Sequence, residues 1–116
     1  MKVEMFLYEQ IRRVRFENGH YIPYADHMLS PTYIGYIEVE EFNEKVIFDL
    51  CNWSCYMPEK PAILHSNIEC CGHGLLLINP INETMYLSKS IGWLITDDRK
   101  IIDKYVEDNR YKLVWS

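Results

Sequence analysis

Residues 33–54 read YIGYIEVEEFNEKVIFDLCNWS, and the hydrophobic period changes partway along this stretch. The part up to Val39 is rich in β-branched and aromatic residues, which suit a half-buried strand. Gly35 interrupts it and predicts a bulge or the close approach of another backbone. From Phe42 onward, apolar residues recur at spacings of three and four, the period of an amphipathic helix. The stretch therefore predicts a strand over 33–38 followed by a helix over 40–54.

The predicted helix has an apolar stripe and an acidic side. The residues expected to face the core are Phe42, Val46, Leu50 and Trp53, with Ile47 widening the stripe. Residues 38–49, called here the acidic segment, contain five acids and one lysine, a net charge of −4. Acids near a helix N-terminus are favoured by the helix dipole, so a solvated helix face is one interpretation.

The other interpretation is a negative patch that attracts a basic protein. Such patches steer positively charged proteins and repel nucleic acid. The residues predicted to contact the partner in this case are Glu40, Glu41, Glu44 and Asp49. Both interpretations fit the sequence.

Length and charge narrow the class of protein. The chain has 116 residues, of which 48% are hydrophobic, and we expect one domain over residues 1–116. Its net charge is −5, whereas a nucleic-acid-binding protein normally carries a basic stripe. The short basic run formed by Arg12, Arg13 and Arg15 is typical of a charged strand face or a protected sheet edge.

No apolar run approaches the roughly 20 residues that a membrane-spanning helix needs. The N-terminal MKVEMFLYEQ alternates and contains acids, unlike a signal peptide. We therefore expect a cytoplasmic protein with neither a membrane nor a nucleic acid as its partner.

Turn residues divide the rest of the chain into short elements. Asn18-Gly19 lies between two β-like runs and predicts a hairpin of residues 11–17 with 20–24. Leu75 to Ile78 predicts a buried strand that pairs with Thr84 to Leu87. Further strands are expected at residues 2–9, 62–66, 91–95 and 111–115. A helix is expected to start at Thr96-Asp97-Asp98, where these residues can cap it, and to end at Asn109.

This order of elements predicts an α+β fold, a mostly antiparallel sheet of hairpins with two helices packed on it. We expect both helices on the same face of the sheet. The residues expected to hold them there are Phe42, Trp53, Ile102 and Val106.

Cysteine and histidine residues are the other candidates for chemistry. The possible metal ligands are Cys51, Cys55, Cys70, Cys71, His65 and His73. Their spacings, Cys-x3-Cys and Cys-Cys-x-His, match no zinc-finger or ribbon pattern. A nucleophile pair such as Cys71 with His73 lacks a recognisable orienting group. We therefore expect reduced thiols, no metal, no cofactor and no enzymatic activity, with a small ligand-binding, metal-binding or catalytic domain as the alternative.

A third possibility is a structural subunit that forms a homodimer through an edge strand. This possibility stands beside a protein that binds a basic partner and a small ligand-binding, metal-binding or catalytic domain.

The stretch at 33–54 also resembles a segment of the small bacterial immunity proteins of contact-dependent growth inhibition systems. That family has a Gly-Tyr-Ile-Glu strand, an acidic turn with Phe, and a helix that ends in an aromatic-Ser pair. The matching residues here are Gly35, Tyr36, Ile37, Glu38, Phe42, Glu44, Leu50, Trp53 and Ser54. The resemblance covers about the first half of the chain, including the hairpin at Asn18-Gly19. Where the family continues with a Gln-Trp-bearing helix, this chain has Pro58 and Pro61.

The resemblance implies a function without catalysis. An immunity protein binds the toxin domain of its own system in a stoichiometric complex and covers the active site. Many such toxins are basic nucleases, so an acidic inhibitor would mimic the phosphate backbone that they bind. The expected partner is therefore a cognate toxin domain, with the acidic helix 40–54 facing it.

Overall fold

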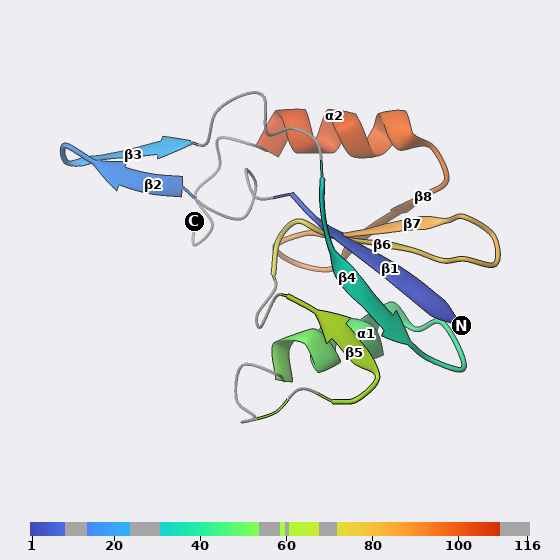
Figure 1. Cartoon of the computed structure of the whole chain (residues 1–116). Coiled ribbons are helices and arrows are strands. Elements are labelled where there is room, and N and C mark those ends of the chain that lie inside the picture. The colour runs from blue at the N-terminus through green and yellow to red at the C-terminus, as the bar shows by residue number, and fades with distance from the viewer. Residues whose placement is uncertain (9–13, 24–30, 54–58, 60, 68–71, 110–116) are drawn as a thin grey trace.

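A computed structural model describes residues 1–8, 14–23, 31–53, 59, 61–67 and 72–109. Within these ranges the chain forms a six-stranded antiparallel sheet, two helices and a separate two-stranded hairpin (Figure 1). The strands are β1 (Lys2–Leu7), β2 (Val14–Glu17), β3 (His20–Pro23), β4 (Thr32–Glu38), β5 (Leu64–Ser66), β6 (Leu75–Ile78), β7 (Met85–Ser88) and β8 (Trp93–Thr96). The helices are α1 (Glu44–Trp53) and α2 (Arg99–Asn109). The predicted α+β class is confirmed.

The N-terminal strand lies in the middle of the sheet. The strand order is β5-β4-β1-β6-β7-β8, so β1 pairs with β4 on one side and β6 on the other. The register places Val3 opposite Ile37 and Met5 opposite Leu77. Val3, Met5 and Leu7 are all buried, as expected for a central strand whose alternate side chains face a core.

The predicted hairpins are present. β2 and β3 pair around Asn18 and Gly19, both of which have positive φ, as the two-residue turn requires. This hairpin forms a sheet of its own and projects away from the six-stranded sheet (Figure 1). β6 spans the predicted residues and pairs with β7, and β8 continues the meander. The strand predicted at 111–115 lies outside the described residues.

The two helices lie on opposite faces of the sheet, so the expectation that they share a face is wrong. In Figure 1, α2 lies above the sheet and α1 below it. Ile47 of α1 is buried in one core cluster with Leu75 and Leu77, whereas Ile102 of α2 is buried in a second cluster with Leu76. Alternate side chains of β6 point to opposite faces, so an apolar residue at every position supplies both cores.

Gly35 marks a bulge in β4, as predicted. Met5 pairs with Gly35, but Phe6 pairs with Tyr33, so Ile34 is an extra residue in β4. Gly35 has a φ of 136°, and a Cβ atom there would lie 2.0 Å from the carbonyl oxygen of His65 in β5. The glycine therefore allows β4 and β5 to approach closely enough to pair.

Both helices are short. α1 has 10 residues and α2 has 11. Neither they nor any other helix within the described ranges has the length and apolar character needed to cross a bilayer.

Candidate partner-binding surface

The acidic segment begins where the chain leaves the sheet at the end of β4. The backbone N–H of Glu38 donates a 2.9 Å hydrogen bond to the carbonyl of Ile63, just before β5. The N–H of Val39 donates to the carbonyl of Met1 at 2.9 Å, and the Met1 amino group donates to the Val39 carbonyl. The start of the acidic segment is therefore fixed from both sides by neighbouring backbone.

The other end of the turn is fixed by a helix cap. The side-chain oxygen of Asn43 accepts hydrogen bonds from the N–H groups of Lys45 at 3.1 Å and Val46 at 3.2 Å. These N–H groups have no partner inside the helix, so Asn43 is the N-cap of α1. The prediction that the helix starts at residue 40 is thus wrong, because the chain bends at Glu40 and Glu41 and becomes helical only from Glu44.

The structure places the four predicted partner-binding acids as follows. Glu40, Glu41 and Asp49 are exposed, and Glu44 is partly buried in the first turn of α1. None of the ion pairs formed within the described part of the chain involves any of these four carboxylates. Their charge is therefore not neutralised by a described basic side chain of this protein.

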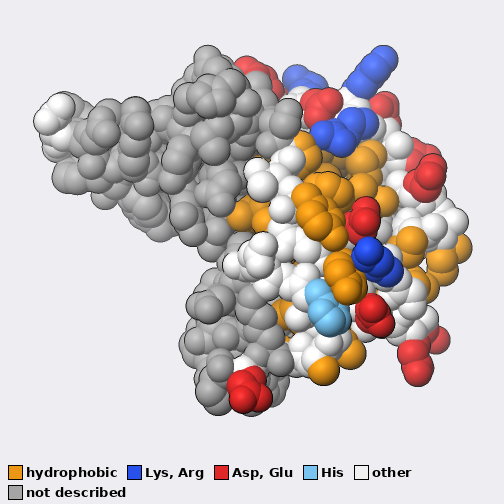
Figure 2. Space-filling model, viewed as in Figure 1, with side chains coloured by type: hydrophobic (Ala, Val, Ile, Leu, Met, Phe, Trp, Pro, Cys, Tyr) orange, Lys and Arg blue, Asp and Glu red, His pale blue; other side chains and the backbone are white. Residues whose placement is uncertain are grey.

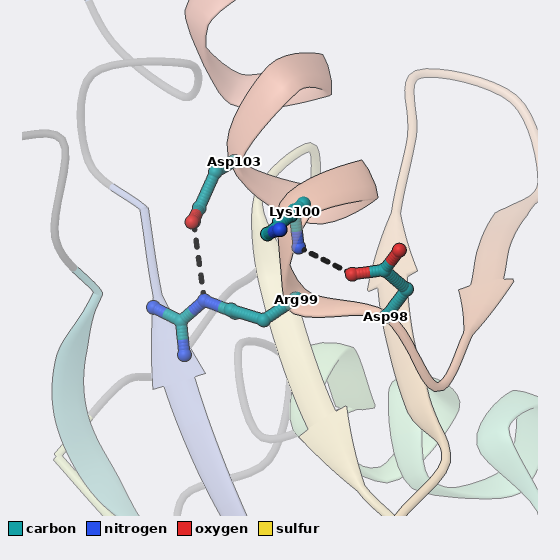
Figure 3. A network of polar contacts seen from close by, with 4 residues as sticks. All are labelled: Asp98, Arg99, Lys100 and Asp103. Carbon is teal, nitrogen blue, oxygen red and sulfur yellow. Dashed lines mark hydrogen bonds and ion pairs between the residues drawn. The ribbon is translucent and has the colours of Figure 1, made fainter.

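Acids on α2 behave differently. Asp103 pairs with Arg99 at 3.1 Å (Figure 3). Asp108 pairs with Lys104 at 3.4 Å, and in each pair the two residues are four positions apart on the helix. Asp98 caps the helix by accepting a 2.9 Å hydrogen bond from the N–H of Lys100, which confirms the predicted capping role (Figure 3). Positive and negative side chains are interspersed over α2 (Figure 2), so this surface has no strong local charge.

α1 is rotated relative to the prediction. Val46 was expected to face the core but is 50% exposed, whereas Ile47 and Cys51 are fully buried. Phe42 and Leu50 pack partly against the core, as expected, and the side chain of Trp53 lies outside the described residues. Phe48 and Val46 lie on opposite flanks of the helix, and turning the larger Phe48 toward the sheet buries more apolar area.

Phe48 belongs to a group of aromatic side chains between α1 and the strands β7 and β8. Its ring meets that of Trp93 edge-on, with 5.7 Å between centroids, and Phe42 packs on Tyr86 at 4.7 Å. We call these four residues the aromatic seam. All four are partly buried, so they pack against the core while keeping an accessible edge.

The sequence interpretation missed the aromatic seam. The available signal was alternation in β7, where Tyr86 lies between Met85 and Leu87 and must point to the opposite face. Which aromatic ring meets which depends on contacts between residues about 45 positions apart, and these cannot be deduced from local patterns.

The candidate metal and nucleophile residues are not brought together in the described part of the chain. Cys51 is buried, with its Sγ 3.6 Å from Sδ of Met5, and it acts as a small apolar side chain in the core. Cys55, Cys70 and Cys71 lie outside the described residues. No group of three or more described His, Cys, Asp or Glu side chains could hold a metal ion.

His65 and His73 both contact tyrosines. His65 is exposed on β5 and stacks on Tyr36 of β4, with 4.6 Å between ring centroids. Nε2 of His73 lies 2.8 Å from the hydroxyl of Tyr105 on α2, and burial raises the pKa of Tyr105. Both histidines thus have a structural role.

In comparisons with known proteins, no protein-family model, curated protein or solved structure matches this chain.

Proposed function

We propose that this chain is an inhibitory binding protein of the immunity type, which neutralises the toxin domain of a contact-dependent growth inhibition system. It would form a stoichiometric complex and catalyse no reaction of its own. The toxin domain would be basic, and the acidic segment would face it.

The observation that carries the proposal is that the acidic segment has negative charge unpaired by described residues, on a backbone held by hydrogen bonds. Glu40 and Glu41 are exposed on a turn whose two ends are fixed by hydrogen bonds, and Asp49 is exposed on α1. These three carboxylates and the partly buried Glu44 form no ion pair with described residues. A negative surface held in one conformation attracts a basic partner without the entropic cost of ordering a loop. The paired acids of α2 provide the contrast, because their charge is balanced within the protein.

The resemblance of residues 33–54 to immunity proteins supports the same proposal. The described residues that carry it, 35–53, lie in strand β4, an acidic turn and helix α1, and Ser54 lies outside the described residues. That is the order of elements expected from the resemblance. It specifies the class of partner, a toxin domain, which charge alone does not.

The proposal expects a toxin domain to be encoded next to this chain's gene, and the test titrates that purified domain with the full chain. We expect Glu41→Lys combined with Glu44→Lys to weaken binding at least about tenfold at low salt, mainly through slower association. The salt dependence of the association rate should also decrease, because fewer charges attract the partner. Surface plasmon resonance at several salt concentrations measures both quantities.

A matched control places the same change in charge elsewhere. Glu4 and Glu83 are exposed, and Glu4 points to the face of the sheet opposite the α1 core. Glu4→Lys with Glu83→Lys should leave affinity nearly unchanged. If both double variants bind like the wild type, with the same salt dependence, the role of the acidic segment is wrong. If the wild-type chain does not bind the toxin domain at all, the proposed function is wrong.

A further inference from the structure

One part of the sheet is covered by neither helix among the described residues. On the face where α1 packs, the buried cluster joins α1 to β1, β4, β5 and β6. Tyr86 of β7 and Trp93 of β8 contact only the flank of this cluster and remain partly exposed. Ile95 lies opposite Tyr86 in the β7–β8 register and is 53% exposed. This face of β7 and β8 is therefore an accessible apolar surface.

The aromatic seam forms the inner edge of this surface. Phe42 and Phe48 on the α1 side each contact a ring on the strand side, so the rings hold one another in place. Ordered aromatic side chains contribute much of the binding energy at protein interfaces, because they bury a large area and lose little conformational freedom. Ile95 extends the surface outward along β8.

Two acids of the acidic segment, Glu41 and Glu44, are close to Phe42 and Phe48 of the aromatic seam along the chain. Glu41 directly precedes Phe42 in the chain. Glu44 is four residues before Phe48 in α1, which places it on the same side of the helix, one turn away. The arrangement is therefore an apolar, aromatic centre with acids at its edge, as in protein interfaces whose rim is charged.

We propose that this surface, formed by the aromatic seam and Ile95 and bordered by Glu41 and Glu44, is where the basic toxin domain docks. The inference rests on the proposed function and adds the apolar contact to it. Arginine or lysine side chains of the partner would pair with Glu41 and Glu44 and lie over the exposed faces of Tyr86 and Trp93. Charge complementarity favours a basic protein over nucleic acid, which the carboxylates would repel.

The test compares two exposed isoleucines on opposite sides of the molecule. Ile95 is 53% exposed at the proposed surface, and Ile101 is 46% exposed on α2, which packs on the other face of the sheet. Ile95→Arg should weaken binding of the adjacently encoded toxin domain at least about thirtyfold, because it brings a like charge against a basic partner. Ile101→Arg makes the same change in net charge and should leave affinity within about twofold. Ile95→Ser should have a smaller effect, mainly through faster dissociation.

Three outcomes are distinguishable. Weaker binding by the Ile95 variants alone supports the inference. Equal affinities of Ile95→Arg, Ile101→Arg and the wild type overturn it, while the proposed function stands. Failure of the wild type to bind the toxin domain overturns the proposed function, and the inference with it.

A second measurement on the wild-type complex guards against a folding defect in the Ile95 variants. Hydroxyl-radical footprinting with and without the toxin domain should show protection of Trp93 and Ile95 but not of Ile101. Equal labelling of Trp93 and Ile95 in the free and bound protein overturns the docking surface whatever the variants do.

Discussion

At the scale of single residues, Gly35 shows why one position tolerates no side chain. A Cβ atom there would lie 2.0 Å from the carbonyl oxygen of His65 and 2.7 Å from Cα of Ser66. Both atoms belong to the β5 backbone, so they cannot move without breaking its pairing with β4. The φ of 136° adds a conformational penalty for any residue with a Cβ.

We therefore expect Gly35→Ala to lower the free energy of unfolding by about 3 kcal/mol or more. The matched control is Gly92→Ala, since Gly92 also has positive φ, at 78°, but has no atom within 4 Å of its would-be Cβ. That variant should lose only about 1 kcal/mol, the cost of the backbone conformation. Urea unfolding measures both, and equal losses would show that the close approach of β5 is not limiting.

At the scale of elements, the start of α1 depends on Asn43. Its side-chain oxygen satisfies the N–H groups of Lys45 and Val46, and its backbone carbonyl accepts the first helical hydrogen bond from Ile47 at 3.0 Å. The cap thus determines where the bend at Glu40 and Glu41 ends and where the helix starts.

Removing the cap should destabilise the protein modestly. We expect Asn43→Ala to lower the free energy of unfolding by about 1 kcal/mol, because two N–H groups lose their acceptor. Asn43→Asp retains an acceptor oxygen at the same position and should stay within a few tenths of a kcal/mol of the wild type. Urea unfolding at neutral pH compares them. Similar stabilities of the Ala and Asp variants would mean that the side chain of Asn43 does not cap α1 in solution.

Elements with a strong local signal were predicted well. Asn18-Gly19 specifies its turn because both residues adopt positive φ at little cost, and Leu75–Ile78 forms a strand because its apolar run is short and bounded by turns. The same apolar run also indicates where the helices pack, because a strand that is apolar at consecutive positions is buried on both faces. That pattern requires a layer on each side of the sheet, as the opposed helices show. The prediction that both helices share one face did not take this into account.

The candidate surface was only partly predictable. The acids of the segment are evident from composition, and their exposure follows from their polarity. The rotation of α1 was not, because Val46 and Phe48 lie on opposite flanks of the helix and both are apolar. The contact of Phe48 with Trp93 decides which flank turns toward the sheet. That contact joins residues 45 positions apart, so only tertiary packing reveals it.

At the scale of the whole molecule, the sheet separates two cores of different composition. The core beneath α1 is aliphatic with the two sulfur atoms of Met5 and Cys51 in contact. The core beneath α2 contains a fully buried tyrosine, Tyr8, whose hydroxyl has no hydrogen-bond partner in the described structure. Burial raises the pKa of Tyr8, and the charge of Asp103 adds to the rise. The guanidinium of Arg99 partly opposes it through its charge and its nearness to the hydroxyl, although the geometry of that contact falls short of a hydrogen bond.

The raised pKa links the stability of the fold to alkaline pH. In the unfolded chain, Tyr8 ionises near its ordinary value of about 10, whereas the folded protein keeps the hydroxyl protonated to higher pH. The folded state therefore holds more protons above about pH 10, and its stability should fall there as pH rises. For one group the slope is at most about 1.4 kcal/mol per pH unit. Below the unfolded pKa both states are protonated, so this contribution does not change with pH.

Tyr8→Phe tests this link, because it removes the hydroxyl and keeps the ring. We expect the variant to be as stable as the wild type or more so at neutral pH, since the lost group is buried without a hydrogen-bond partner among described residues. Its stability should fall less between about pH 8 and about pH 11. Tyr105→Phe is the comparison at neutral pH only, because its hydroxyl lies 2.8 Å from Nε2 of His73 and its loss should cost about 1 kcal/mol there. The pKa of Tyr105 is also raised by burial, so this variant too should lose less stability at alkaline pH. Urea unfolding measures the free energy of unfolding of each variant across this pH range. If this free energy falls with pH as steeply in Tyr8→Phe as in the wild type, Tyr8 does not couple the stability of the fold to pH.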